Sequence, residues 1–369
     1  MTDLAAPISW GASRSANRVA LAPMTNKQSH SDGRLSDAEI AWLARRAKGG
    51  FGTVITGGYA VSPEGRVWEG QAGVYSDDHI APLARLATAL APTSTPGIVQ
   101  LIHGGSRFTP EIAHLQGISA SAGSSWRSAT ERDIAHLLDA HRSAALRVQA
   151  AGLQGIEIHA AHGYLPAQFI SPTQNTRTDQ WGGDLNARAR FLRTLVQTVR
   201  SAVGPDFIVG VRLSAEDTRR GITPQETAII AGWIAQDGID YLHLSLRNAL
   251  ATSAEPPRTH PIRLIRAAIP SEVRLVVAGR LWSPHDANLA LARGADIVAL
   301  GHAAIHHPDW PQDMADPTWT PTPPPTSTAR LTELGVSDPF LRYLRENWPE
   351  TVMDETSEDH AHHLDHGCI

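Results

Sequence analysis

The chain contains a single cysteine, Cys368, beside its C-terminal residue. One thiol cannot form a disulfide within the chain, and it cannot supply a cysteine-ligated zinc or iron–sulfur site. The sequence also lacks a charge bias, because 32 Lys and Arg stand against 37 Asp and Glu. Such a near balance provides no basic surface for nucleic acid or for an anionic membrane.

Hydrophobic runs of membrane length are missing as well. No uncharged apolar run approaches the roughly 18 residues that a membrane span needs. The N-terminal stretch MTDLAAPISW has no basic segment followed by an apolar core, so a signal peptide is not expected. These absences together lead us to expect a cytoplasmic protein.

Short apolar runs rich in Val and Ile are what the chain has instead. Each is bounded by Gly, Pro or polar residues, and the runs are continuous rather than alternating, as expected of strands covered on both faces. They occupy residues 18–24, 52–61, 97–103, 155–161, 207–214, 240–246, 274–280 and 295–301.

Amphipathic helical segments lie between these runs. The segment 184–203 keeps a period near 3.6 in its apolar positions, with Asp184 as a candidate N-cap and Gly204 as a candidate stop. Further helices are predicted at 36–48, 79–90, 131–151, 224–236, 261–268 and 284–293. Strands alternating with helices predict an α/β fold of the (β/α)8 TIM-barrel type, and a doubly wound sheet is the alternative.

The predicted organisation is one barrel domain over residues 1–312, with an N-terminal extension at 1–16 that closes the barrel bottom. A long excursion at 104–130 follows the third strand, where loops are often functional. Residues 313–369 are predicted to form a proline-rich strap, a short helix and an acidic, His-rich tail. The tail composition is more typical of a frayed terminus than of a metal site.

Polar residues gather where the predicted strands end, and the carboxyl ends of barrel strands form the active-site face. His159 and His162 can both donate to one oxygen, as an oxyanion hole does. Tyr164 stays protonated at neutral pH and can deliver a proton. Gln100 offers a donor and an acceptor to a heterocycle, and Arg212 is a permanent cation. A metal-dependent hydrolase that uses the histidine pair is the alternative, but no carboxylate or third histidine stands beside the pair.

Glycines at the ends of the last two strands suit the usual phosphate site of such barrels, where backbone N–H groups approach an anion. They are followed by basic residues, in the pairs Gly279-Arg280 and Gly301-His302. The first strand ends in Pro23, Met24 and Thr25. All these strand ends are predicted to converge on one mouth.

Three segments resemble the Old Yellow Enzyme family of flavin-dependent ene reductases, also called NADH:flavin oxidoreductases. The most specific is HAAHGYLPAQFISPTQNTRTDQWGGDLNARARF at 159–191, and NRVALAPMTN at 17–26 and VQLIHGGSR at 99–107 match in order. The resemblance runs from about residue 7 to residue 308 and implies a TIM barrel with FMN at the carboxyl-end mouth.

The resemblance also implies roles for individual residues. His159 and His162 would bind the carbonyl oxygen of an enone, and Tyr164 would donate a proton. NADH or NADPH would reduce the flavin before an activated alkene takes its place at the same site, which is a ping-pong mechanism. The residues implied to bind FMN are Pro23, Met24, Thr25 and Gly58 at the ring, Gln100 and Arg212 at the pyrimidine edge, and Gly279, Arg280, Gly301 and His302 at the phosphate.

Three positions depart from the family pattern. His302 replaces the usual arginine after the last strand, Trp181 replaces a tyrosine, and Lys27 stands where some subgroups carry an aromatic residue. A flavin-binding barrel without useful turnover is therefore a further alternative. The natural substrate, the choice between NADH and NADPH and an oligomeric state are not indicated by the sequence, although an oligomer is compatible with it.

Overall fold

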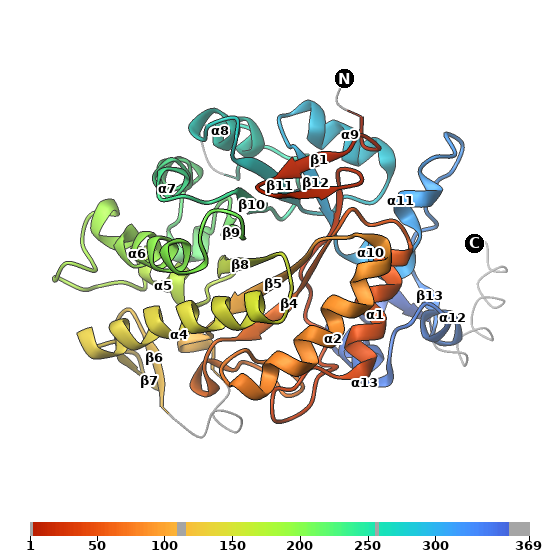
Figure 1. The fold of residues 1–369 in the computed structure, drawn as a ribbon. Helices are drawn as coiled ribbons and strands as arrows, with labels where there is room; N and C mark the ends of the chain where they lie inside the picture. Colours follow the sequence, from red (N-terminus) through yellow and green to blue (C-terminus); the bar gives the residue numbers. More distant parts are fainter. Residues whose placement is uncertain (1–2, 109–115, 255–257, 354–369) are drawn as a thin grey trace, which may run out of the picture.

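The computed structural model describes residues 3–108, 116–254 and 258–353, and its centre is a closed barrel of parallel strands (Figure 1). Each strand pairs with the next along the chain, and the last pairs with the first through Val298↔Val19 and Leu300↔Leu21. The barrel strands are β3 Val19–Leu21, β4 Thr53–Ala60, β5 Gly97–Ile102, β8 Gly155–Ala160, β9 Ile208–Ser214, β10 Tyr241–Ser245, β11 Arg274–Ala278 and β12 Ile297–Leu300. The predicted TIM barrel is confirmed, and the doubly wound alternative is wrong.

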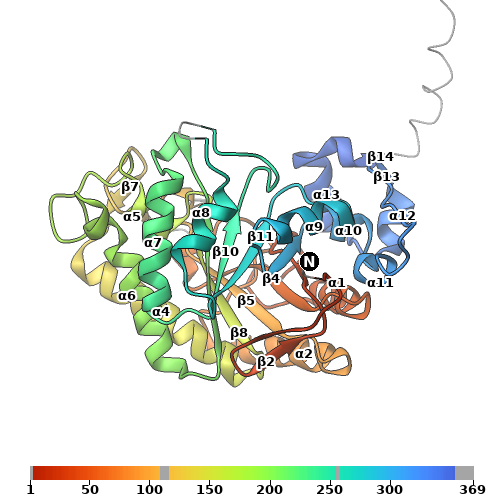
Figure 2. The same ribbon diagram turned by 90° about the horizontal axis from the view of Figure 1, so that it is seen from above.

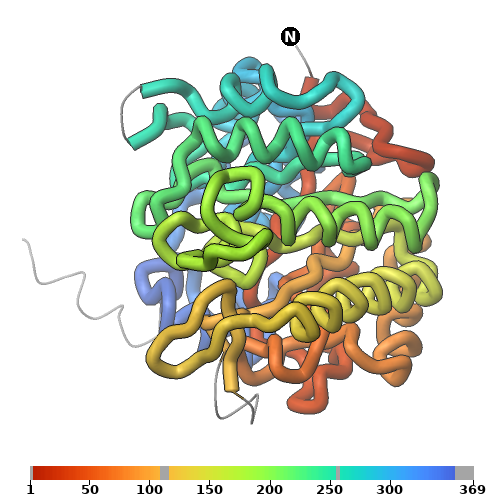
Figure 3. The backbone as a smooth tube through the Cα atoms, turned by 90° about the vertical axis from the view of Figure 1, so that its left-hand side faces the viewer, coloured from red at the N-terminus to blue at the C-terminus, as the bar shows by residue number. Residues whose placement is uncertain are grey.

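The predicted helices are all present, with ends within one residue of the prediction. They are α1 Asp37–Lys48, α2 Ile80–Leu90, α4 Glu131–Ala150, α6 Leu185–Val203, α7 Pro224–Gln236, α8 Pro261–Ala268 and α9 Pro284–Ala292. Figure 3 shows α4, α6 and α7 running side by side over one flank of the barrel. Asp184 caps α6 by accepting from the Ala187 N–H, and Gly204 ends it at φ 77°.

Shorter helices, strands and turns lie outside the barrel strands and the helices that cover them. The helices are α5 Leu165–Ile170, α10 His302–His306, α11 Trp310–Asp313, α12 Thr328–Glu333 and α13 Asp338–Asn347. Pairs of short strands are β1 Ile8–Trp10 with β2 Ser13–Ser15, β6 Gly117–Ser119 with β7 Trp126–Ser128, and β13 Thr326–Ser327 with β14 Val352–Met353. Single 3₁₀ turns occupy Pro63–Gly65, Asp77–His79, Ala91–Thr93, Gly105–Arg107, Thr218–Arg220 and Pro349–Thr351.

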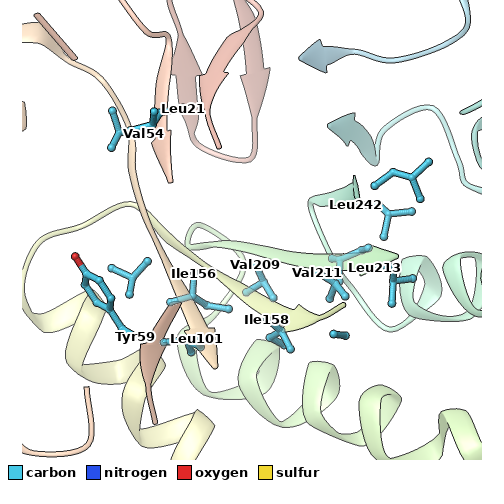
Figure 4. Packing of buried hydrophobic residues seen from close by; sticks show 14 of the residues in the cluster. Leu21, Val54, Tyr59, Leu101, Ile156, Ile158, Val209, Val211, Leu213 and Leu242 are labelled. Atoms are coloured by element: carbon cyan, nitrogen blue, oxygen red, sulfur yellow. The ribbon is translucent and has the colours of Figure 1, made fainter. Parts of the chain in front are cut away.

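Side chains alternate between the two faces of each barrel strand. Along β8, Ile156 and Ile158 face the helices, whereas Glu157 and His159 face the interior. Figure 4 shows part of the outward layer, including Leu101 of β5 and Val209 and Val211 of β9. A second apolar cluster fills the lower interior, with Ala20, Ile55, Ile98, Ile208, Tyr241, Val276 and Ile297 among its members.

The N-terminal hairpin closes the amino end of the barrel, as the sequence suggested. Trp10 is 2% exposed and packs edge-on against Tyr241, with ring centroids 5.1 Å apart. Its indole Nε1–H donates to Ser15 Oγ at 2.9 Å, which satisfies the one polar atom of the buried ring. Within the described ranges, no helix is both long and apolar enough to cross a bilayer.

The C-terminal elements lie against one side of the barrel, close to α10 and α11 (Figure 2). Phe340 of α13 packs edge-on against Trp42 of α1 at 5.6 Å. Beneath them, the fully buried Arg46 of α1 donates to the carbonyl oxygens of Ala304, Ile305 and Leu334. Burial and the neighbouring Arg45 lower the pKa of Arg46 well below its usual value, and the charge of Asp309 opposes the shift. The carbonyl oxygens satisfy the buried N–H groups of the guanidinium. The guanidinium therefore joins α1, α10 and the end of α12.

Replacing this guanidinium should destabilise the fold. Arg46→Met keeps an apolar stem over Trp42 but leaves three buried carbonyls without their donor. We expect the free energy of unfolding to fall by about 2–4 kcal/mol, measured by urea denaturation. Arg45→Met is the matched control, because Arg45 pairs with Asp309 at the surface, where a salt bridge contributes about 1 kcal/mol or less. Equal losses in the two variants would contradict the bridging role of Arg46.

Candidate active site

One cavity of about 770 Å³ lies at the carboxyl ends of the barrel strands. Every residue that the sequence singled out as a candidate site residue lines this cavity. They are Pro23, Met24, Thr25, Gly58, Gln100, His159, His162, Tyr164, Arg212, Gly279, Arg280, Gly301 and His302. The predicted convergence of the strand ends on one mouth is confirmed.

His159 ends β8 and is 4% exposed. Its Nδ1 accepts a hydrogen bond from the backbone N–H of Ala161 at 3.2 Å. A neutral imidazole that accepts at Nδ1 carries its proton on Nε2. Burial, together with the neighbouring His162 and Arg212, lowers the pKa of His159 well below its usual value. The ring is therefore a neutral donor at neutral pH.

His162 stands beside it, with ring centroids 5.0 Å apart and an edge-on orientation. Its backbone adopts φ 57°, a strained value for a side chain of this size. Its Nε2 contacts Ser245 Oγ at 2.8 Å, and Arg212 Nη2 donates to the same oxygen at 3.1 Å. With the arginine as donor, the serine proton is available for Nε2, which favours the tautomer with the His162 proton on Nδ1.

The pKa of His162 is also well below its usual value, because of burial and then the charge of Arg212. Both imidazoles are therefore uncharged at neutral pH. Donation of both rings to one oxygen is the arrangement predicted from sequence. His159 has its Nε2–H for this purpose, whereas Nε2 of His162 lies against Ser245 Oγ.

Tyr164 is the N-cap residue of α5 and is 8% exposed. Its ring lies edge-on to His159 at 4.8 Å, and the Arg107 guanidinium lies 4.8 Å above the ring centroid. Arg107 Nη1 also donates to the His162 carbonyl oxygen at 2.6 Å. Burial raises the pKa of Tyr164, and the charges of Arg107 and Arg212 oppose that shift. The phenol therefore holds its proton at neutral pH and sits against the imidazole pair.

Gln100 and Arg212 face the cavity from β5 and β9. The Gln100 backbone N–H donates to Thr56 Oγ1 at 3.2 Å, beside an irregularity in the pairing of β4 with β5. Arg212 Nη1 donates to the Pro23 carbonyl at 3.4 Å, while its buried Nε has no partner among the described residues. A Cβ at Gly58 would lie 3.3 Å from Gln100 Oε1, so a glycine there keeps the amide accessible.

Glycines at the ends of β11 and β12 hold backbone close to its neighbours. Gly279 has φ 151°, and a Cβ there would lie 2.4 Å from the Leu246 carbonyl oxygen. A Cβ at Gly301 would lie 3.3 Å from Met24 Sδ. These positions allow backbone N–H groups to approach a ligand, as a phosphate site requires.

His302 follows at the same end of the cavity. Its ring lies edge-on to Trp348, with centroids 4.5 Å apart. Burial lowers the pKa of His302, and the carboxylate of Glu350 partly opposes the shift. In contrast to the permanent charge of Arg280, His302 therefore supplies a cation only when a ligand raises its pKa.

The C-terminal segment supplies a wall of the cavity that sequence reasoning missed. Its lining residues are Pro324, Tyr343, Trp348, Glu350 and Thr351. Burial raises the pKa of Tyr343 and an interaction with the Thr25 side chain opposes the shift. The Lys27 ammonium lies 5.4 Å from the Tyr343 ring centroid. Lys27 Nζ also contacts Glu346 Oε2 at 3.4 Å. The aromatic residues after the proline-rich strap could have indicated this wall. They were not predicted because they lie far along the chain from the motifs that form the rest of the site.

A metal centre at the histidine pair finds no support. Within 3–108, 116–254 and 258–353, no three His, Cys, Asp or Glu side chains are grouped to hold an ion. The His-rich tail and Cys368 lie outside those ranges.

The closed parallel barrel, with its cavity at the carboxyl ends of the strands, places this protein in the class of TIM-barrel proteins. The model of the NADH:flavin oxidoreductase / NADH oxidase family matches residues 3–317, and the chain belongs to this family. The resemblance to the Old Yellow Enzyme family is thereby confirmed. The protein is an NAD(P)H-dependent flavin oxidoreductase whose cofactor is FMN.

Known proteins agree with this assignment. A probable NADH-dependent flavin oxidoreductase of Bacillus subtilis, YqiG, is 33% identical over 308 residues, covering 80% of this chain and 82% of the relative. The NADH:acrylate oxidoreductase of Vibrio harveyi is 33% identical over 312 residues, and the match covers 80% of this chain but 31% of that protein. A variant of morphinone reductase in complex with tetrahydroNAD superposes with a TM-score of 0.79 at 25% identity, covering 97% of this chain and 100% of that one.

We expect His302, at the end of β12, to make FMN affinity sensitive to pH. A phosphate dianion beside His302 should raise the depressed pKa of the imidazole, so binding takes up a proton. Affinity should therefore fall as pH rises through the pKa of the bound state. We expect the FMN dissociation constant to increase between about pH 6.5 and 9, and His302→Arg to bind more tightly with a flatter profile.

Three other groups near His302 titrate or carry charge, namely Arg280, His306 and Glu350. Arg280→Met in both backgrounds separates the permanent cation from the titrating one. A flat profile in the parent, with no gain from His302→Arg, would mean that His302 does not contact the phosphate.

Proposed function

We propose that this protein reduces activated C=C bonds, such as those of enones, with NADH or NADPH as the reductant. The observation that carries the proposal is the contact of two neutral imidazoles and a protonated phenol on one wall of the cavity. Neutral hydrogen-bond donors stabilise the negative charge that develops on a carbonyl oxygen, and they keep their own protonation state while doing so. A hydrolytic role would need a nucleophile or a metal, and neither is suggested by this grouping.

The cofactor would lie against the strand ends that line the cavity. Bound FMN supplies the exchange of a hydride between the nicotinamide and the alkene. In our proposal Thr25, beside Pro23 and Met24, donates to the ring and tunes its potential, while Gly58 leaves room for it. Gln100 and Arg212 bind the pyrimidine edge. Backbone at Gly279 and Gly301, together with Arg280 and His302, binds the phosphate.

The substrate would be oriented by the imidazole pair. His159 Nε2–H and the proton of His162 would both donate to the carbonyl oxygen and stabilise enolate charge. Tyr164 would hold its proton at the phenol oxygen and deliver it to the α-carbon. Arg107, above the phenol ring, limits how far burial raises the pKa of Tyr164 and so keeps proton transfer feasible.

A ping-pong order is supported by the shared lining of the active-site cavity. Among the described residues, the proposed oxygen-binding, proton-donating and cofactor-binding groups all line that one space. The nicotinamide and the alkene would therefore occupy the same place in turn. A relative named for acrylate and a structural neighbour that binds tetrahydroNAD fit this proposal.

Removing the imidazole pair tests the oxygen-binding role. His159→Ala with His162→Ala should retain FMN, lose most of its affinity for a phenol, and slow enone reduction by about 10²-fold or more. Flavin absorbance, phenol titration and stopped-flow reoxidation measure the three quantities. His136→Ala is the control, because His136 is largely exposed and pairs with Glu64. If the double variant reduced cyclohexenone at the parent rate, the proposed oxygen-binding role of the pair would be wrong.

Tyr164→Phe tests the proton donor. Flavin reduction by the nicotinamide should be unchanged, whereas reoxidation by an enone should slow by roughly 10²–10⁴-fold, the usual scale for a general acid. Tyr75→Phe is the control, because the Tyr75 hydroxyl donates to the Asp32 carbonyl away from the cavity. Equal slowing of both half-reactions would instead indicate that Tyr164 positions ligands.

A further inference from the structure

A fully buried carboxylate lies in the barrel interior next to the predicted cofactor-binding residues. Glu157 is two positions before His159 on β8, and none of its surface is exposed. Its Oε1 accepts from Gln100 Nε2 at 2.7 Å, and its Oε2 accepts from the Tyr241 hydroxyl at 2.9 Å and contacts His243 Nδ1 at 2.8 Å. These groups come from β5 and β10, so the carboxylate joins strands across the interior.

The surroundings favour the ionised form of Glu157. Burial raises its pKa, but His243, the charge of Arg212 and the bond from Gln100 outweigh burial and bring the pKa below its usual value. An ionised carboxylate only accepts hydrogen bonds. Every group within hydrogen-bond distance must therefore direct a donor at it.

This requirement decides which way the Gln100 amide points. With Nε2 directed at Glu157, the other end of the amide, Oε1, is directed elsewhere. That oxygen lies near Gly58, where an added Cβ would be 3.3 Å away, and both residues line the cavity. The cavity edge thus presents an acceptor from Gln100, while Arg212 has an unpartnered buried Nε–H.

We propose that Glu157 is a positioning residue that sets the polarity of the cofactor edge by holding Gln100 with its carbonyl oxygen toward the flavin. The inference rests on the proposed role of Gln100 as a ligand of the pyrimidine edge. That edge of a flavin carries one donor, N3–H, between two carbonyl acceptors. A Gln100 oxygen complements N3–H, whereas a reversed amide would set its NH₂ group against it and leave both donors unsatisfied.

A double-mutant cycle tests the coupling. The variants are Glu157→Gln, Gln100→Met and the pair, with the FMN dissociation constant measured by fluorescence quenching. Glu157→Gln presents a donor as well as an acceptor, so the Gln100 amide is no longer held in one orientation. In the protein that retains Gln100, Glu157→Gln should weaken FMN binding about 10-fold, which is the scale of one mismatched hydrogen bond. In the Gln100→Met background the same change should alter binding by less than about 2-fold.

The ionisation of flavin N3–H gives a readout that is independent of activity. It changes the visible spectrum of oxidised flavin in alkaline solution, and an acceptor facing N3–H raises its pKa. The N3 pKa of the bound flavin should fall in Glu157→Gln, and the shift should vanish when Gln100 is Met. The charged or titrating groups around Glu157 are His243, Tyr241 and Arg212, which are the same in both backgrounds.

Tyr241→Phe is the matched control, because it removes a different hydrogen bond to the same carboxylate and leaves the Gln100 bond in place. It should change neither FMN affinity nor the N3 pKa beyond the scatter of the parent. If Glu157→Gln does not fold, as judged by thermal melting, Glu157→Asp replaces it, because the shorter carboxylate keeps the charge but withdraws from Gln100.

The possible outcomes are distinct. Equal effects of Glu157→Gln in both Gln100 backgrounds would show that the carboxylate acts through its charge or through stability, and would overturn the positioning role. The positioning role would also be overturned if Glu157→Gln had the FMN affinity and the flavin N3 pKa of the parent protein. If Gln100→Met alone left FMN affinity and the N3 pKa unchanged, the proposed contact of Gln100 with the flavin would fail instead.

Discussion

Closure of the sheet into a barrel is the constraint on which the site depends. In a closed barrel every second side chain of each strand faces a shared interior, so residues far apart in sequence must pack against one another. The lower interior is apolar and is sealed by Trp10 against Tyr241. Above it, Glu157 needs donors, and inward positions of β5 and β10 supply them. One of these donors, Gln100, also lines the cavity, so satisfying the buried charge constrains a group of the site.

The same enclosure sets the charge state of the catalytic candidates. His159 and His162 stand in a partly closed space beside Arg212, so protonating either would add a second positive charge with little water to screen it. Both remain neutral. The hydrogen bond that His159 Nδ1 accepts from the Ala161 N–H leaves the His159 proton on Nε2, while His162 Nε2 contacts Ser245 Oγ. Burial raises the pKa of Tyr164 and so keeps the phenol protonated. The wall therefore presents donors without net charge, which suits an oxygen that becomes negative only during reaction.

The C-terminal segment completes the cavity from outside the barrel. Arg46 binds carbonyl oxygens of α10 and of the end of α12, and Phe340 packs on Trp42, so the segment is held by buried contacts. Tyr343 and Trp348 then reach Thr25 and His302 respectively. The segment therefore contacts the cavity at both places without being part of the barrel strands.

The sequence determined much of this protein by itself. Continuous Val- and Ile-rich runs alternating with amphipathic segments predict strands and helices because burial on two faces or on one stripe leaves a local pattern. The ends of α6 followed from Asp184 and Gly204 for the same reason, since caps are local interactions. The rule that the carboxyl ends of parallel strands share one face was enough to bring every candidate residue, from Pro23 to His302, into one cavity.

Only the tertiary structure decided how those residues are held. In the sequence, Glu157 is one charged residue within an apolar strand. Its hydrogen-bond partners on β5 and β10 are more than fifty positions away along the chain. Neither the link of Ser245 to His162 nor the contact of Tyr343 with Thr25 leaves a periodic signal, because each joins single residues from separate elements. Secondary structure and site composition follow from local pattern, whereas hydrogen-bond direction, tautomer and protonation depend on distances that exist only once the barrel has closed.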